Sequence, residues 1–563
     1  MNNKTKQIIV VVAVFALALA SLGTVIGLIV NTGRLSEYSG GFSYTLNGSR
    51  ATITGYDGDD KEVVVPDRVR GNRVVAISKG AFSSKASVIE KITINTTSSA
   101  FSLDKEAFKD MTALKSVVLP NGLKEISEGA FSGCKALRSV IIPDSVTSIG
   151  DSAFYNCSSL VFAYNSEEYS TEGDDAIDEE IFYMPSGLLE IGANAFENCT
   201  TMIGAHFNKA LEKIGNEAFY KATAFTEVTL EEDCDLATIG NSAFQNTKLR
   251  SNSSNPLEFK HLVNIGDKAF ANITTNFTQF KFPATVKTVG ANAFMSTTSL
   301  STVEFEEGST LETLGEGVFQ DCTYLSSIVL PDSIKEIPAK AFMGCTRLLY
   351  SKTFTIGKNV EKIGDGAFAV YTNNATYSRY SIEVHSDNEY FSTIELQEYK
   401  KSTSSNTYDH GLLTNAEGTV VYAYFGMYDK TSSNLNGTDY FDFYDVNGNR
   451  IREITELKSY AFAGVAFESI RLPKSVKNVD EFIFYESDVK DAYIESISWE
   501  WKKTSFNKKA EGKPKDDTDE EVSQYFVRVM ILNTAASPEE IGAFRELLSA
   551  DDIHNGLATS DEI

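Results

Sequence analysis

Apolar and polar positions along the chain repeat with a period close to 23 residues. Residues 114–136 (LKSVVLPNGLKEISEGAFSGCKA) and 137–159 (LRSVIIPDSVTSIGDSAFYNCSS) carry apolar residues at the same places. Each copy contains a Phe that recurs along the chain at Phe82, Phe108, Phe131, Phe154, Phe196, Phe219, Phe244, Phe270, Phe294, Phe319, Phe342, Phe368, Phe462 and Phe484. Most steps are 22 to 26 residues, and two are 42 and 94. One copy is too short to bury its apolar face, so the repeat predicts stacked coils of a solenoid.

The two halves of one copy have different periods. Val117 and Leu119 alternate with Ser116 and Val118, which predicts a short strand that Pro120 ends. Ile126, Ala130 and Phe131 are spaced like residues on one side of a helical turn. We therefore expect an α/β fold, a leucine-rich-repeat solenoid of about 14 coils of 22–26 residues with one parallel strand per coil.

The repeat resembles the BspA-like leucine-rich repeats of surface proteins. The motif L-x-x-V-x-L-P-x-x-L-x-x-I-G-x-x-A-F-x-x-C is nearly complete at 137–157 and at 325–345, where Pro338 replaces the usual Gly. The resemblance covers about residues 61–375 and 451–500. It implies a curved extracellular solenoid that binds host or neighbour-cell components, and it implies no catalysis.

An apolar run at residues 8–30 precedes the repeats and is long enough to span a bilayer as a helix. Lys4 and Lys6 lie before it, which places residues 1–7 in the cytoplasm by the positive-inside rule. We expect an uncleaved signal anchor, with a cleaved signal peptide and secretion as the alternative. Residues 31–60 then contain Asn47-Gly48 between alternating runs, which predicts a β-hairpin that caps the solenoid.

Two breaks in the period divide the solenoid at 61–375 from the coils that follow. An acidic insertion at 160–185 carries eight carboxylates within residues 167–180, and we interpret it as a solvated segment rather than a calcium site. A β-rich island is expected at 376–450, followed by C-terminal repeats at 451–505 and a charged linker at 506–521. Residues 522–563 predict a small segment with one helix.

Aromatic residues are dense in the island. They form either its own small core or a ligand-facing patch, and the patch is the candidate ligand site because a binding site needs a feature that breaks the repetition. Its residues are Tyr422, Tyr424, Phe425, Tyr428, Tyr440, Phe441 and Tyr444. The nearby Asp445, Asn447, Asn449 and Glu456 match calcium-loop spacing, but Arg450 replaces the required Gly, so residues 446–449 predict a hairpin turn.

Cysteine and histidine positions indicate no catalytic or metal site. Five of the six cysteines share one repeat position, which favours small buried side chains over disulfides: Cys134, Cys157, Cys199, Cys322 and Cys345. The five histidines are scattered without paired spacing. We expect no cofactor, no metal and no enzymatic activity.

Net charge argues against one class of partner. The formal charge of −26 disfavours nucleic acid, whose phosphates require basic protein surface. The sequence therefore predicts a single-pass protein of the cell membrane whose extracellular solenoid binds protein or glycan in adhesion. Two alternatives are a structural envelope component that self-associates and an enzyme with its site in the island.

Overall fold

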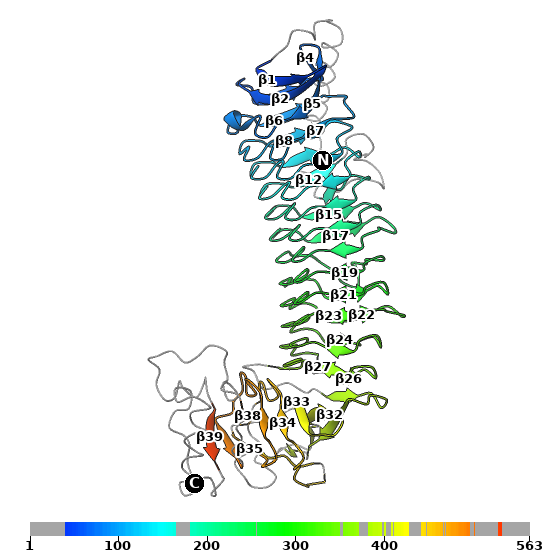
Figure 1. Cartoon of the computed structure of the whole chain (residues 1–563), viewed down its shortest axis with the longest axis vertical. Helices are drawn as coiled ribbons and strands as arrows, with labels where there is room; N and C mark the ends of the chain where they lie inside the picture. The colour runs from blue at the N-terminus through cyan, green and yellow to red at the C-terminus, as the bar shows by residue number, and fades with distance from the viewer. Residues whose placement is uncertain are drawn as a thin grey trace, which may run out of the picture. The chain divides into compact units, whose positions relative to one another are not determined.

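A computed structural model describes residues 40–164, 181–254, 256–348, 353–370, 381–396, 399–400, 407–408, 410–426, 441–445, 447–465, 467, 469–495, 500–501 and 527–531. The chain divides into two compact units, residues 1–202 and 203–563. Within each unit, parallel strands of successive coils lie one above another (Figure 1).

The first unit begins with the expected hairpin. Strands β1 (Phe42–Asn47) and β2 (Arg50–Tyr56) pair antiparallel, and their sheet also holds β4 (Arg68–Val69), β5 (Asn72–Ile77) and β7 (Ser102–Leu103). One parallel ladder follows with β3 (Glu62–Val65), β6 (Lys91–Ile94), β8 (Ser116–Val118), β10 (Ser139–Ile141) and β12 (Phe162–Tyr164). A second ladder joins β9 (Glu125–Ile126), β11 (Ser148–Ile149) and β14 (Glu190–Ile191), and β13 (Ile181–Tyr183) follows the acidic insertion.

The second unit repeats the two ladders. The first consists of β15 (Gly204–Phe207) with β17 (Glu227–Leu230), then β20 (Gln279–Phe282), β22 (Thr302–Phe305) and β24 (Ser327–Ile328), then β26 (Phe354–Ile356) with β28 (Ile382–Val384). The second joins β16 (Lys213–Ile214), β18 (Thr238–Ile239), β19 (Asn264–Ile265), β21 (Thr288–Val289) and β23 (Thr313–Leu314), then β25 (Glu336–Ile337) with β27 (Lys362–Ile363).

The island and the last coils form the rest of this unit. The island contains β29 (Phe391–Glu395), β30 (Tyr399–Lys400), β31 (Thr407–Tyr408), β32 (His410–Asn415) and β33 (Val420–Gly426). The coils add β34 (Glu456–Leu457), β36 (Asn478–Val479) and β38 (Glu500–Trp501) in one ladder, and β35 (Ser469–Leu472), β37 (Asp491–Ile494) and β39 (Arg528–Ile531) in the other. β33 pairs with β34 in parallel, so the island continues directly into the coil ladder.

The expectation of an α/β fold is wrong, because the fold is mostly β. In the described residues the one helix is the 3₁₀ turn η1 (Ser83–Lys85). The segment around each repeat Phe is a row of turns whose alternate N–H groups bond the next coil: Gly129, Phe131 and Gly133 donate to the carbonyls of residues 151, 153 and 155. In a helix these N–H groups would form hydrogen bonds within their own coil. In the stacked coils they form hydrogen bonds to the neighbouring coil instead.

These turns require left-handed backbone two residues before and two after the Phe. Gly129 and Gly133 adopt φ of 62° and 76°, a region that glycine enters without steric cost. Other coils place L-residues there, with φ between 50° and 66°: Glu106, Asp110, Ser152, Asn156, Asn194, Asn198, Glu217, Lys221, Ser242, Asn246, Lys268, Asn272, Asn292, Ser296, Asp321, Lys340, Tyr460, Phe482 and Glu486. Alternation of right- and left-handed residues prevents a helix from forming.

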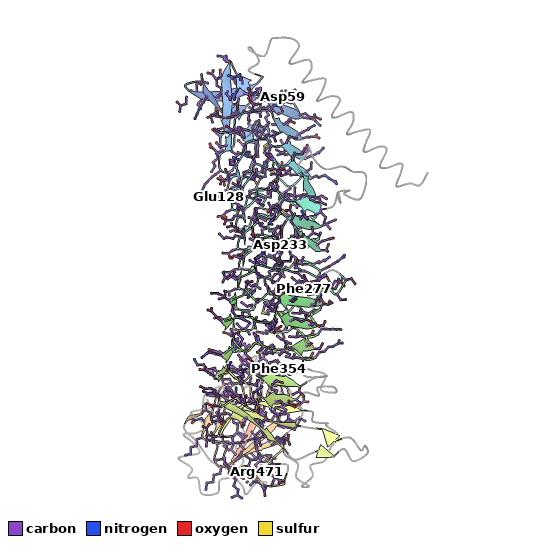
Figure 2. The ribbon with its side chains drawn as sticks, turned by 90° about the vertical axis from the view of Figure 1, so that its right-hand side faces the viewer. Asp59, Glu128, Asp233, Phe277, Phe354 and Arg471 are labelled. Atoms are coloured by element: carbon purple, nitrogen blue, oxygen red, sulfur yellow. The ribbon has the colours of Figure 1, made fainter. Side chains whose placement is uncertain are left out.

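The interior of each coil is filled from three sides. Val117 from the first ladder, Ile126 from the second and Phe131 from the turns are all 1% exposed or less. The Phe rings stack between coils, with centroids 5.2 Å apart for Phe108 and Phe131 and 5.3 Å apart for Phe219 and Phe244. Phe277 and Phe354, labelled in Figure 2, are likewise buried within the stack. The predicted stacked core is therefore confirmed in both units.

Several predicted segments lie outside the described residues. They are the apolar run at 8–30, most of the acidic insertion (165–180), the linker at 506–521 and the C-terminal helix predicted after Ser537. Among the residues that are described, none belongs to a helix with the length and apolar character needed to cross a membrane. The described part of the C-terminal segment 522–563 contains β39.

Candidate functional site

The structure separates the seven aromatic residues of the predicted patch. Tyr424, Phe425 and Phe441 are only 6%, 4% and 2% exposed, so the expectation that these three face a ligand is wrong. Tyr424 contacts the rings of Phe441, Phe462 and Phe467, which places it in a core shared with the following coils. Tyr422 and Tyr444 are partly exposed, while Tyr428 and Tyr440 lie outside the described residues.

The island is therefore part of the solenoid core rather than a separate module. Plain alternation would put Tyr422 and Tyr424 on the same face of β33, but the pairing of β33 with β32 shifts register at Tyr422, because Leu413 pairs with Ala423 and Thr414 with Val421. Tyr424 lies in the core, while the partly exposed Tyr422 packs edge-on against Phe391. The hairpin turn predicted at 446–449 is supported by the antiparallel bridge between Tyr444 and Arg450. The carboxylate of Asp445 accepts the N–H groups of Asn447 and Asn449 across this turn, and these bonds lower its pKa.

A different feature breaks the regular surface of the second unit. Among the described residues between β17 and β20, none forms a strand of the first ladder, although the second ladder continues there from β18 to β19. Arg250 still donates its N–H to the carbonyl of Thr226, but Ser251 then pairs with Phe277 of the next coil. The insertion NSSNP (252–256) follows, and the chain returns at Leu257. Residues 256–260 therefore run beside β17 without joining its ladder.

A cavity of about 320 Å³ lies between β17 and residues 256–260. Its lining includes the apolar residues Val228, Leu230, Leu236, Leu257 and Phe259. Leu230 is partly exposed, whereas the equivalent Phe207 and Phe282 are fully buried. The equivalent Phe305 of β22 is also partly exposed, because β24 pairs with only Thr302 and Val303 of that strand. Beside β17, where the following strand is missing, the exposed apolar surface borders a cavity whose volume is at the lower end of those typical of ligand pockets.

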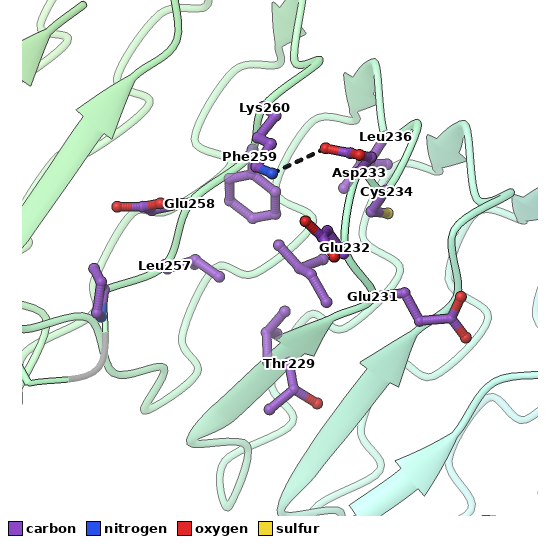
Figure 3. Close-up of a pocket in the computed structure, with 13 residues that line it drawn as sticks. Thr229, Glu231, Glu232, Asp233, Cys234, Leu236, Leu257, Glu258, Phe259 and Lys260 are labelled. Atoms are coloured by element: carbon purple, nitrogen blue, oxygen red, sulfur yellow. Dashed lines mark hydrogen bonds and ion pairs between the residues drawn. The ribbon is translucent and has the colours of Figure 1, made fainter.

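The rim of this cavity is acidic (Figure 3). Glu231, Glu232, Asp233 and Glu258 line it with a single cation, Lys260. Lys260 lies 2.9 Å from Asp233, and this hydrogen bond and charge lower the pKa of Asp233. The carboxylate of Glu231 accepts the backbone N–H of Lys209, 3.0 Å away. Lys260 is thus matched by Asp233, and the exposed Glu232 and Glu258 leave the rim with excess negative charge.

The arrangement suits binding rather than reaction chemistry. The thiol of Cys234, at the edge of the cavity, is buried, and burial raises its pKa, so the reactive thiolate is disfavoured. His206 hydrogen-bonds Thr229 at 2.8 Å on the outer side of β15 and β17, and burial lowers its pKa. Among the described residues, no group of three metal-ligating side chains converges.

Sequence comparison identifies the repeat. The model of the BspA type leucine-rich repeat region matches residues 75–179, 172–260, 263–396 and 441–512. The chain belongs to the BspA-type leucine-rich repeat family. The predicted resemblance is thereby confirmed, and the match includes the interrupted coil and the two ends of the island. No curated protein matches the sequence.

Several solved structures are similar to this chain. The pneumococcal vaccine antigen PcpA is 16% identical, with 92% of this chain and 98% of that chain covered and a TM-score of 0.41. A leucine-rich repeat protein from Bacteroides ovatus is 20% identical over 58% of this chain and 90% of that one, with a TM-score of 0.37. A leucine-rich cell surface protein from Faecalibacterium prausnitzii is 21% identical over 59% and 85%, with a TM-score of 0.34.

The sequence contains a signal for the cavity that the length of the repeat does not reveal. The step from Phe244 to Phe270 is 26 residues, which is within the ordinary range. The position of the extra residues matters more than their number, because NSSNP falls inside the expected strand rather than at a coil corner. Asn, Ser and Pro are poor strand residues, so this composition marks the interruption.

Proposed function

We propose that this BspA-type protein is a non-catalytic, cell-surface binding protein of the adhesion type. Residues 8–30 would anchor it in the membrane, with the solenoid outside the cell, where it meets an extracellular protein or glycan. The supporting observation is the interrupted ladder of the second unit: a rigid repeat scaffold presents an apolar cavity beside an open strand edge. Repeat scaffolds commonly use such extended surfaces for binding.

The island contributes to this proposal as a second candidate surface. Tyr422 and Tyr444 keep part of their rings exposed, and Tyr390 is 48% exposed. Aromatic rings of this kind stack on sugars and peptides and supply much of the energy of interfaces. The buried Tyr424, Phe425 and Phe441 would hold this surface in place rather than contact a ligand.

Two measurements test the proposal. Protease added to intact cells is expected to degrade the solenoid, and full protection would contradict an extracellular location. Purified residues 31–563 are expected to bind some members of glycan and extracellular-protein arrays. A protein that remains monomeric and binds none of them would argue against adhesion, whereas concentration-dependent self-association would favour a structural role.

A further inference from the structure

We infer that the cavity beside β17 binds an extended, basic peptide segment of a partner protein by strand addition. This inference rests on the proposed function, because it names the partner chemistry of that binding surface. Three observations carry it: an unpaired strand edge, an apolar floor and an acidic rim. Each constrains a different property of the ligand, namely its backbone, its alternate side chains and its charge.

The strand edge determines the ligand's backbone. Glu231 donates its N–H to Phe207 in the preceding coil, while the carbonyl of Thr226 accepts from Arg250 in the following coil. Backbone groups alternate between the two neighbours of a strand, so the N–H and C=O groups of Val228 and Leu230 face the following coil. β17 pairs there with no strand in the described part of the chain. An incoming extended chain can bond these groups as the missing strand would.

The floor of the cavity determines the side chains that point inward. A peptide strand directs every second side chain toward the solenoid interior. Leu230, Leu257 and Phe259 lie there, and Leu230 is only partly covered. Burying an apolar side chain of valine or leucine size against them contributes about 1.5–3 kcal/mol before binding costs. The inward positions of the peptide are therefore apolar.

The rim determines the peptide's charge. Lys260 is paired with Asp233, so an incoming acidic residue finds no spare cation on the rim, whereas a basic residue meets the exposed Glu232 and Glu258 (Figure 3). The whole chain carries −26, which steers basic ligands toward it before contact. The acidic side chains alone define no site. They select the sign of a ligand whose position the cavity and the strand edge define.

A regular coil of the same unit supplies a matched control. Glu306 and Glu307 follow Val303 and Phe305 of β22 as Glu231 and Glu232 follow Val228 and Leu230 of β17. Glu306 accepts the backbone N–H of Ala284 just as Glu231 accepts that of Lys209. β22, however, is paired with β20 along its whole length and with β24 at Thr302 and Val303, so its ladder continues into the following coil. Charge reversal at Glu307 therefore changes net charge beside a strand whose ladder is not interrupted.

The test measures binding of short synthetic peptides to purified residues 31–563 at 0.15 M salt by isothermal titration calorimetry. The probe is acetyl-Lys-Val-Lys-Val-Lys-amide. Its comparisons are a version with Gly in place of Val and a version N-methylated at the central amides. We expect the probe to bind at least tenfold more tightly than either comparison. Equal affinity for all three peptides, or no binding of the probe, would overturn strand addition.

Protein variants test whether the peptide binds at the cavity beside β17. Leu230→Trp fills the cavity, and the paired change Glu232→Lys with Glu258→Lys reverses the charge of the rim. Each variant is expected to bind the probe peptide at least tenfold more weakly than the parent. Glu307→Lys is expected to bind like the parent. The double charge variant alters exposed residues alone, so it remains informative if Leu230→Trp misfolds. Unchanged affinity in a folded rim variant would refute the site. If the rim variant no longer binds the probe peptide but still binds the same array members as the parent, the peptide site is supported and the surface that binds those partners lies elsewhere. If the variant binds neither, the whole inference is supported.

Discussion

The thiol of Cys157 lies 3.1 Å from the carbonyl oxygen of Phe131 in the preceding coil and donates a hydrogen bond to it. The same bond recurs between Cys134 and Phe108, at 3.0 Å. All six cysteines are free and buried, which confirms the expectation for the five at the shared repeat position, and burial raises the pKa of Cys134 to about 12. These cysteines therefore serve as small side chains that satisfy a buried carbonyl group between coils.

Cys157→Ala is expected to destabilise the coils around it by about 0.5–1.5 kcal/mol, because the Phe131 carbonyl loses the thiol donor and keeps only the backbone N–H of Cys134. Cys157→Thr is the matched control. Thr297 occupies the same repeat position and donates to the Phe270 carbonyl at 2.6 Å. Hydrogen exchange of residues 130–160 measures the difference, and equal protection in the Ala and Thr variants would contradict the role of the thiol as donor.

The left-handed turn positions give a second prediction. Lys268 is exposed and has φ of 55°, where a side chain with a Cβ is strained by about 1–2 kcal/mol. Lys268→Gly removes this strain at some cost in unfolded-state entropy, so stability is expected to be unchanged or to rise by up to about 1 kcal/mol. Lys268→Val is expected to destabilise, because β-branched residues tolerate this region least. Urea unfolding of the two variants should differ in that direction.

The sequence predicts the stacking and the first strand of each coil because both repeat over many copies. It misses the second ladder because a strand as short as Glu125–Ile126 offers one inward side chain and no alternation to detect. The spacing of Ile126, Ala130 and Phe131 fits one side of a helical turn and equally fits inward positions of a strand followed by turns. The left-handed backbone at the repeat positions of residues 129 and 133 distinguishes these two possibilities. The sequence indicates it only where Gly stands at these positions, in six of the copies, and the other copies have L-residues there.

The candidate site is harder to predict for a physical reason. Tyr422 and Tyr424 are two residues apart, so alternation along β33 predicts that both face the same side, and the register shift between Val421 and Ala423 that separates them is not visible in the sequence. Alternation also does not say which face is covered. That depends on Phe462 and Phe467, which belong to coils after the island and pack on Tyr424. The cavity beside β17 likewise depends on where the inserted residues 252–256 leave the ladder, and the length of the coil does not reveal this.

The column of stacked rings gives the third prediction. Phe131→Ala is expected to cost about 3–5 kcal/mol locally, because the ring is fully buried between Phe108 and Phe154. Fraying should spread mainly to the two adjacent coils, since coupling in a solenoid is between nearest neighbours. Hydrogen exchange is expected to show lost protection near residues 108–154 and unchanged protection near residue 342. Uniform loss across the chain would contradict local coupling.

The last prediction concerns the ion-pair network that joins the island to the final coils. Arg450, in the island hairpin, donates to Glu495 at 2.9 Å and to Asp442 at 3.2 Å, and Arg471 also pairs with Glu495. Burial tends to raise the pKa of Glu495, but the hydrogen bond from Arg450 and the charges of both arginines outweigh it and hold the pKa below the ordinary value of 4.5.

A carboxylate with a lowered pKa stabilises the folded state above the unfolded pKa, and this contribution disappears as the pH falls through the folded value. Stability of residues 441–495 is therefore expected to be constant above about pH 5 and to fall at more acidic pH. Glu495→Gln should remove the part of this acid dependence due to Glu495 and lower stability at pH 7 by about 1.5–3 kcal/mol, the range for hydrogen bonds to charged groups. Exposed Glu453→Gln is the control and should leave the acid profile unchanged. Hydrogen exchange measured from pH 3.5 to 7 compares the three proteins, and an identical acid profile in Glu495→Gln and the parent would show that the network contributes nothing to joining the island to the coils.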